Sequence, residues 1–251
     1  LGLASHIAAD VITAYGTMVL YPLSRWRASL GTTFVIDPLF TAIVAAALAA
    51  SLWRGRRWPA FAGLLVLAGY VTLQAGLQQQ ALDLARTAVP AAAQWAAFPQ
   101  PFSPFNWKLI ASSEAQHLQA HVNLAGRRPL VPAWQALRPL HDIAAAFRPP
   151  TALEWKVRHR FGPDPELKPI AETLWADERF AAFRRFATHP SLSAIEQEGG
   201  GVTCVWFTDL RYDLPALPDT FRYGFCREGT EAQWQLFRLR YFSQHARQRI
   251  E

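Results

Sequence analysis

The opening stretch of the chain, residues 1–40, is largely apolar yet carries one imidazole and two carboxylates. These groups are His6, Asp10 and Asp37, at positions where a membrane or core helix would carry Leu or Ala. Placing them in apolar surroundings costs several kcal/mol unless they are paired, neutralised or bound to a metal. On a helix, His6 and Asp10 lie one turn apart on one face, about 6 Å along the axis, and can reach one ion. This spacing predicts two ligands of a divalent metal, zinc or manganese, and a complete site needs further ligands.

Asp37 can join that pair only if the first apolar segment is broken, because straight antiparallel helices would leave it roughly 15 Å away along the axis. The run Tyr15-Gly16-Thr17 offers a place for such a break. Otherwise Asp37 caps the helix that Pro38 begins, or it pairs with Arg25 or Arg27. The sequence favours the cap or the ion pair over a place in the metal site.

Four short runs between residues 6 and 38 follow one another in a fixed order: His6-x-x-x-Asp10, Thr13-Ala14-Tyr15-Gly16-Thr17, Pro22-Leu23-Ser24-Arg25 and Phe34-Val35-Ile36-Asp37-Pro38. In this order they resemble a family of bacterial inner-membrane metal-dependent hydrolases, described as LexA-regulated in some members. The resemblance implies a membrane-embedded site in which His6 and Asp10 hold the metal and Asp10 and Asp37 are catalytic residues. It implies a lipid-linked or phosphate-ester substrate, which no residue here selects.

Two departures from that family pattern bear on the site. Members of the family usually begin with further membrane segments that carry a His-Arg-Gly-x-Thr-His-like motif, and nothing in this sequence matches it. The chain starts at Leu1, so we expect it to lack N-terminal segments and part of the metal site. An acidic residue that often precedes the Ile-Asp-Pro run is replaced here by Gly31.

Charge divides the chain into two parts. Only 6 of the 25 Lys and Arg residues and 3 of the 19 acidic residues precede residue 99. The proline-rich run at residues 98–105 marks the boundary. We therefore expect a transmembrane helical domain at residues 1–98 and a soluble α+β domain with an antiparallel sheet at residues 99–251.

Three apolar segments, at about residues 1–23, 33–53 and 58–80, approach the length of roughly 20 residues that a membrane helix needs. An Arg-rich turn at residues 54–57 joins the second and third segments, and Trp53 and Trp58 stand on either side of it. This arrangement is typical of a transmembrane hairpin. The Arg-rich turn favours a cytoplasmic tip and a periplasmic C-terminal domain, although Arg25 and Arg27 argue the other way. The expected location is the bacterial inner membrane, with the chain crossing more than once and the lipid bilayer as partner.

A net charge of +6 raises the question of nucleic acid. The basic residues are scattered singly among acids and aromatic residues, and the longest basic run is the turn at residues 54–57. Basic loops beside apolar segments suit membrane insertion. The sequence therefore predicts no nucleic-acid partner.

Beyond residue 99 the pattern is that of an α+β domain. Strands are expected at residues 107–111 and 117–124, joined by a hairpin at residues 112–114, and again at residues 201–212, 220–227 and 233–241, with helical spacing at residues 133–147 and 166–187. Residues before this domain, about 78–97, are expected to extend the third apolar segment as an amphipathic helix interrupted near Pro90.

Two further groups could do chemistry. His117 and His121 share a face in a helix or a strand, and a metal there would need His141 and Asp142 as well, so surface or packing histidines are the simpler interpretation. Cys204 and Cys226 lie on adjacent expected strands, where they either form a disulfide in a periplasmic domain or pack as two thiols.

Three functional hypotheses follow. The first is a membrane-bound metal-dependent hydrolase that attacks its substrate with a metal-activated water. The second is a non-catalytic membrane anchor whose C-terminal domain binds a partner in the cell envelope. In the third, His6 and Asp10 only hydrogen-bond each other inside a helix bundle.

Overall fold

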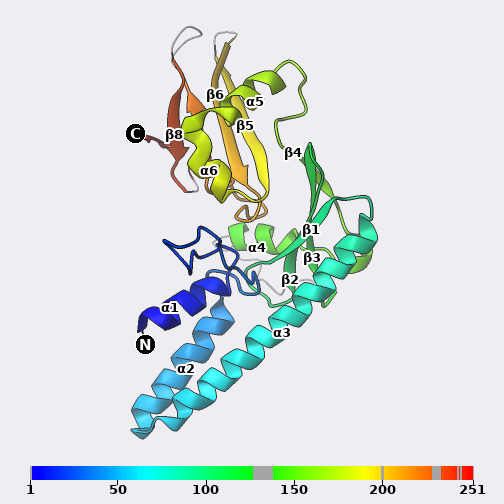
Figure 1. The fold of residues 1–251 in the computed structure, drawn as a ribbon. Coiled ribbons are helices and arrows are strands. Elements are labelled where there is room, and N and C mark those ends of the chain that lie inside the picture. The colour runs from blue at the N-terminus through cyan, green and yellow to red at the C-terminus, as the bar shows by residue number, and fades with distance from the viewer. Residues whose placement is uncertain are drawn as a thin grey trace.

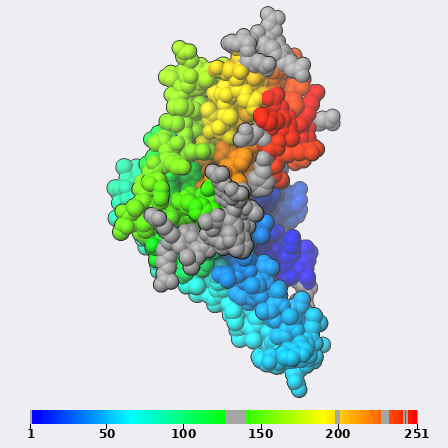
Figure 2. All heavy atoms as spheres, turned by 180° about the vertical axis from the view of Figure 1, so that it is seen from behind, coloured from blue at the N-terminus to red at the C-terminus, as the bar shows by residue number. Residues whose placement is uncertain are grey.

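The computed structural model describes residues 2–126, 138–198, 201–227, 233–241, 243 and 245–250. A helical N-terminal part is followed by two antiparallel sheets, with the sheets at one end of the molecule and a helical hairpin at the other (Figure 1). Seen from behind, the hairpin projects as a narrow arm from the body formed by the sheets (Figure 2). The expected order of a helical part before an antiparallel α+β part is confirmed.

The first helix, α1 (Gly2–Val11), is short and none of its residues is buried. The chain leaves the helix at Thr13, whose hydroxyl bonds to the carbonyl of Asp10, and it turns at Gly16 with a φ of 81°. From there to residue 37 it forms turns and a single bridge between Thr17 and Ala28. The expectation of about three membrane-length apolar helices is therefore wrong. The first segment holds a helix of only 10 residues, which ends at Val11 before the turn at Gly16.

The second and third helices, α2 (Pro38–Arg54) and α3 (Trp58–Ala88), form the hairpin. Within the described residues α3 alone is both long enough and apolar enough to cross a membrane, and α2 is an apolar helix of 17 residues. Gly55 ends α2 in the left-handed conformation, with a φ of 59°. Small residues bring the helices together, since a Cβ added at Gly63 would lie 2.3 Å from the Cβ of Ala47.

The C-terminal half of α3 leaves the hairpin and packs on the first sheet (Figure 1). That sheet has the order β1 (Gln94–Pro99), β2 (Asn106–Ser112), β3 (Gln116–Asn123) and β4 (Lys156–His159), with every pair antiparallel. Its core joins helix and strand residues: Leu77, Ala81, Ala85, Ala97, Trp107, Leu109, Ala120 and Val122. The short helices α4 (Arg138–Ala145) and η2 (Pro150–Ala152) lie between β3 and β4 in the chain.

The second sheet has the order β5 (Pro190–Glu198), β6 (Gly201–Asp209), β7 (Tyr223–Cys226), β8 (Gln235–Leu239) and β9 (Arg247–Arg249), all antiparallel. Helices α5 (Lys168–Ala176) and α6 (Ala181–Phe186), with the short η3 (Glu178–Phe180) between them, cover one face. The core there is aromatic and centres on Trp175, Phe180, Phe183, Phe207 and Phe225.

Several expected elements are confirmed and others were missed. The hairpin of β2 and β3 turns where predicted, and β6, β7 and β8 lie within the predicted strands. The helix expected at residues 166–187 is interrupted at Asp177. The carboxylate of Asp177 accepts a hydrogen bond from the backbone amide of Arg179 and so caps a new turn. The helix expected to continue to about residue 97 ends at Ala88 instead, and residues 94–99 pair with β2 as a strand. The first part of the helix expected at residues 133–147 lies outside the described residues.

Cys204 and Cys226 face each other in the register of β6 and β7 and form a disulfide. They are the two cysteines of the chain. The disulfide alternative from the sequence is therefore the one that the structure contains.

One buried ion pair joins the two sheets. Lys108 of β2 is fully buried and its Nζ contacts the carboxylate of Asp213, which follows β6. The same Nζ donates to the carbonyl of Leu210 at 2.7 Å, and Gln119 of β3 donates to the other Asp213 oxygen at 2.8 Å. Arg211, beside them, donates to the carbonyl of Ala14 at 2.9 Å. The sheets and the loop after α1 are thus held together by charged hydrogen bonds.

Candidate functional site

His6 and Asp10 lie on one face of α1, as the spacing predicted. His6 Nε2 and Asp10 Oδ2 are 3.6 Å apart, and their side chains are 75% and 45% exposed. Both side chains are exposed, unlike the buried pair inside a helix bundle that the purely structural hypothesis assumes. The distance lies just beyond hydrogen-bond range. It does suit two ligands of one metal. Bonds of about 2.0–2.2 Å at a tetrahedral angle place two donor atoms about 3.4 Å apart.

The metal set is incomplete within the part of the chain that the structure describes. There, no three His, Cys, Asp or Glu side chains come together in a way that could hold a metal ion. His6 and Asp10 fit a divalent metal as two donors, and they do not form its whole coordination shell.

Asp37 is the cap of α2, one of the two roles that the sequence favoured. Its Oδ1 accepts from the backbone amides of Leu39 and Phe40, at 2.9 and 3.0 Å. Its Oδ2 accepts from the hydroxyl of Tyr70 on α3 at 2.6 Å. Both carboxylate oxygens therefore hold the start of the hairpin, and the structure does not bring Asp37 into a group with His6 and Asp10.

The other histidines that the sequence singled out do not share a site. His121 is partly buried and its ring packs against Phe147, and desolvation lowers its pKa to about 3. His141 and Asp142 form an exposed pair, with 3.8 Å between Nδ1 and Oδ1. His117 lies instead at the boundary between the two sheets, the seam, where its Nε2 faces the carbonyl of Pro190 at the start of β5. Packing is the role in which the structure places His121, as the simpler interpretation held.

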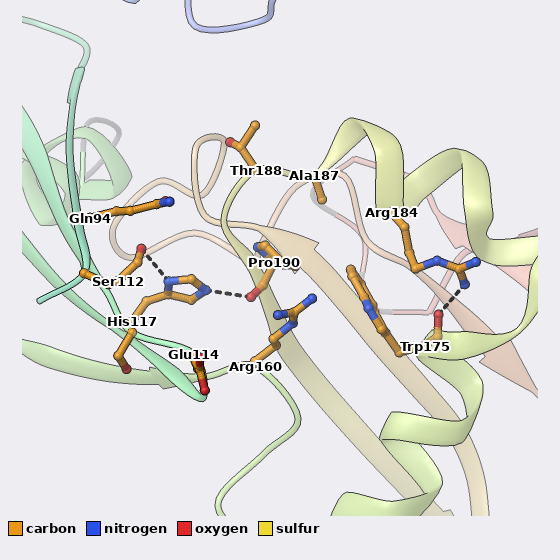
Figure 3. Close-up of a pocket in the computed structure, with 12 residues that line it drawn as sticks. Gln94, Ser112, Glu114, His117, Arg160, Trp175, Arg184, Ala187, Thr188 and Pro190 are labelled. Atoms are coloured by element: carbon orange, nitrogen blue, oxygen red, sulfur yellow. Dashed lines mark hydrogen bonds between the residues drawn. The ribbon is translucent and has the colours of Figure 1, made fainter.

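The seam between the sheets holds a cavity of about 330 Å³ that sequence analysis did not find (Figure 3). The strands of the first sheet line one side, and residues 187–190, which lead from α6 into β5, line the other. Ser112 and His117 come from the hairpin of β2 and β3. Residues so far apart in the sequence leave no spacing signal, and His117 was the one lining residue with chemistry that the sequence picked out.

The hydrogen bonds at this seam fix the protons of two histidines. His117 Nε2 lies 2.9 Å from the carbonyl of Pro190, which can only accept, so Nε2 carries a proton. Burial lowers the pKa of His117, so the ring is neutral and its Nδ1 accepts from Ser112 Oγ at 2.8 Å. With the Ser112 hydroxyl hydrogen used in this way, His189 Nδ1, at 3.3 Å, is the donor to Ser112 Oγ. Ser112 is therefore held between two neutral rings (Figure 3 shows the Ser112–His117 and His117–Pro190 bonds).

Acid should destabilise this seam. Burial lowers the pKa of His189 from 6.5 to about 4. Between these two pH values the unfolded chain binds a proton at this histidine and the folded chain does not, so stability falls as the pH falls. Stability should decrease by roughly 3 kcal/mol from this group over that window. Urea unfolding at several pH values measures it.

A matched pair of variants assigns this loss of stability. His189→Asn removes this group's share and should make the acid loss smaller by roughly 3 kcal/mol, while the lowered pKa values of His117 and His121 keep the rest of the slope. His245→Gln, at an exposed histidine, should leave the profile unchanged. An unchanged profile in His189→Asn would show that the ring is not the source.

Comparisons with known proteins bear on the helical part. Residues 1–81 match the family model described as YdjM inner membrane protein. The match contains α1, α2 and most of α3, and with them His6, Asp10 and Asp37. It is consistent with a bacterial inner-membrane protein family and supports membrane association. No curated protein and no solved structure matches the chain at a significant level.

Proposed function

We propose that this chain is an inner-membrane, metal-dependent hydrolase in which His6 and Asp10 supply two ligands to a divalent metal, zinc or manganese. The observation that carries the proposal is the 3.6 Å separation of His6 Nε2 and Asp10 Oδ2 on one face of α1, which suits two ligands of one ion. Both residues lie in the part that matches an inner-membrane family. The remaining ligands would come from outside the described residues.

The residues of the chain would have distinct tasks at this site. A divalent metal held there would supply a bound water of lowered pKa as the nucleophile for a lipid-linked or phosphate ester. His6 donates the nitrogen and Asp10 the oxygen, and one helical turn fixes their spacing. We assign the carboxylate ligand of the metal to Asp10. Asp37 has a positioning role, because both of its oxygens already accept hydrogen bonds from Leu39, Phe40 and Tyr70.

We propose further that α2 and α3 cross the membrane as a hairpin with both sheets in the periplasm. Apolar side chains on both helices are exposed, among them Leu48, Leu52, Leu64 and Leu65. The tip carries three arginines, which favours a cytoplasmic location. The Cys204–Cys226 disulfide suits an oxidising compartment. Arg27, which argued for the opposite orientation, is engaged within the protein, where it donates to the carbonyl of Gly16 at 3.0 Å.

Metal content tests the hydrolase directly. The intact protein, purified in detergent, should retain zinc or manganese, and both His6→Ala and Asp10→Ala should lose at least about tenfold in affinity. Elemental analysis after equilibration with each metal measures this. His141→Ala is the matched control, since it removes a histidine from an exposed His–Asp pair of similar spacing and should change nothing. Intact protein that binds neither metal would overturn the proposal.

The second candidate is a non-catalytic membrane anchor whose sheets bind an envelope partner. The observation that favours it is the incomplete ligand set at His6 and Asp10 within the described residues. Crosslinking of the full-length chain in membranes separates the candidates. A specific adduct that persists in a His6→Ala, Asp10→Ala double variant, together with absence of metal from the intact protein, would favour the anchor.

A further inference from the structure

Arg160 lines the seam cavity, and no described residue forms an ion pair with its guanidinium. It follows β4 and is partly buried, and its guanidinium lies 5.3 Å from the ring centre of Phe161 and 5.4 Å from that of Trp175. Among the described residues its side chain makes no hydrogen bond or ion pair, and its Nε is buried without a partner. Leaving a guanidinium donor buried and unpaired is costly.

The other charged groups of the cavity are either engaged or at its margin. Arg184 donates from Nη1 to the carbonyls of Trp175 and Asp177, at 2.5 and 2.6 Å, and its Nη2 lies 3.6 Å from the carboxylate of Glu178. Glu114 is exposed at the hairpin between β2 and β3 and forms no ion pair with Arg160. His117 is neutral. Within the part of the chain that the structure describes, Arg160 is thus the one guanidinium lining the cavity that has no hydrogen-bond or ion-pair partner, which matches a ligand with a single negative charge.

Neutral groups around Arg160 complete a small polar site. The hydroxyl of Thr188 and the amide of Gln94 make no hydrogen bonds within the described chain, and both side chains line the cavity opposite Arg160 (Figure 3). Trp175 supplies an aromatic wall. A volume of about 330 Å³ lies at the lower end of the range for small-molecule sites.

We propose that this cavity binds a small carboxylate, with Arg160 as its charge partner. A guanidinium presents two parallel N–H donors that match the two oxygens of a carboxylate. Thr188 and Gln94 donate to the same group or to an amide beside it. The apolar remainder of the ligand lies against Trp175. This site is separate from the proposed metal at His6 and Asp10, so either can fail without the other.

Two matched ligands test the site on the unmodified full-length chain in detergent. N-benzoylglycine and its amide differ in the carboxylate alone, and isothermal titration should show the acid binding at least about tenfold more tightly. Equal binding of the two, or tighter binding of inorganic phosphate than of the acid, would overturn the assignment. A peptide with a free C-terminus, compared with its amidated form, shows whether the natural carboxylate ends a chain or belongs to a small acid.

Variants then locate the binding. Arg160→Gln should weaken N-benzoylglycine by at least about tenfold and leave the amide unchanged, and Arg160→Lys should weaken the acid less, because it keeps the charge and loses the paired donors. Arg185→Gln is the control: it removes a positive charge from the exposed side of α6, outside the cavity, and should change affinity less than about twofold. If Arg160→Gln does not fold, Arg160→Lys and the ligand pair still decide. Full affinity in Arg160→Lys and Arg160→Gln alike would refute the proposal.

Discussion

Replacing Lys108 by methionine is expected to lower the free energy of unfolding of the two-sheet part by about 3 to 5 kcal/mol. Methionine fills a similar volume, so the loss comes from electrostatics. Asp213 would keep a buried carboxylate with only Gln119 as a side-chain donor, and the Leu210 carbonyl would lose its partner. Urea unfolding in detergent, followed by tryptophan fluorescence, measures the change.

Two further variants isolate the cause. Adding Asp213→Asn to Lys108→Met removes the orphaned charge and should restore part of the stability. Lys168→Met removes an exposed lysine, 3.7 Å from Glu172, and should change stability by less than about 0.5 kcal/mol. A loss below about 1 kcal/mol in Lys108→Met would show that the pair contributes little to holding the sheets together.

The disulfide is the second feature expected to make a large contribution to the free energy of unfolding. Changing Cys204 and Cys226 together to serine should destabilise the second sheet by roughly 3 kcal/mol, because the bond closes a loop over a separation of 22 residues in the unfolded chain. Reduction of the unmodified protein should give a similar loss, and an unfolding titration with and without reductant measures it. No effect of reductant on stability would contradict this expectation.

The same bond reports the compartment of the sheets. The chain has two cysteines, so thiol alkylation of cells lysed in acid gives a simple count. If the sheets lie in the periplasm, no thiol should react until reductant is added, and two should react afterwards. Two reactive thiols without reductant would place this part of the chain in a reducing compartment.

Local patterns predicted the parts of this fold that depend on local causes. Alternating apolar residues predicted β6 and β7, and the Asp37-Pro38 pair predicted the cap of α2. The first apolar segment was wrongly predicted as a membrane-length helix, because its composition suits such a helix while the backbone leaves the helical path after Val11. Strand β1 was missed since it follows a long helix and its identity depends on pairing with β2.

The candidate sites divide in the same way. The spacing of His6 and Asp10 is a property of one helix, and the sequence predicted it. The seam cavity needs β2, β3 and the lead into β5 to meet, so Ser112 and His189, 77 residues apart, come together through tertiary packing alone. A buried Lys108 was equally out of reach, because lysine is ordinarily a surface residue.

Helix α3 runs unbroken for 31 residues, from the Trp58 tip to Ala88 beside the first sheet. At 1.5 Å per residue it is about 46 Å long, against a bilayer interior of about 30 Å. The surplus is packed on β1 and β2 through Leu77, Ala81 and Ala85. With the hairpin across the membrane as proposed, this packing would hold the seam cavity at a fixed distance from the lipid surface, and a tilt of the hairpin would move the cavity relative to that surface. A thinner or thicker bilayer would change which surface-bound molecules that cavity can reach.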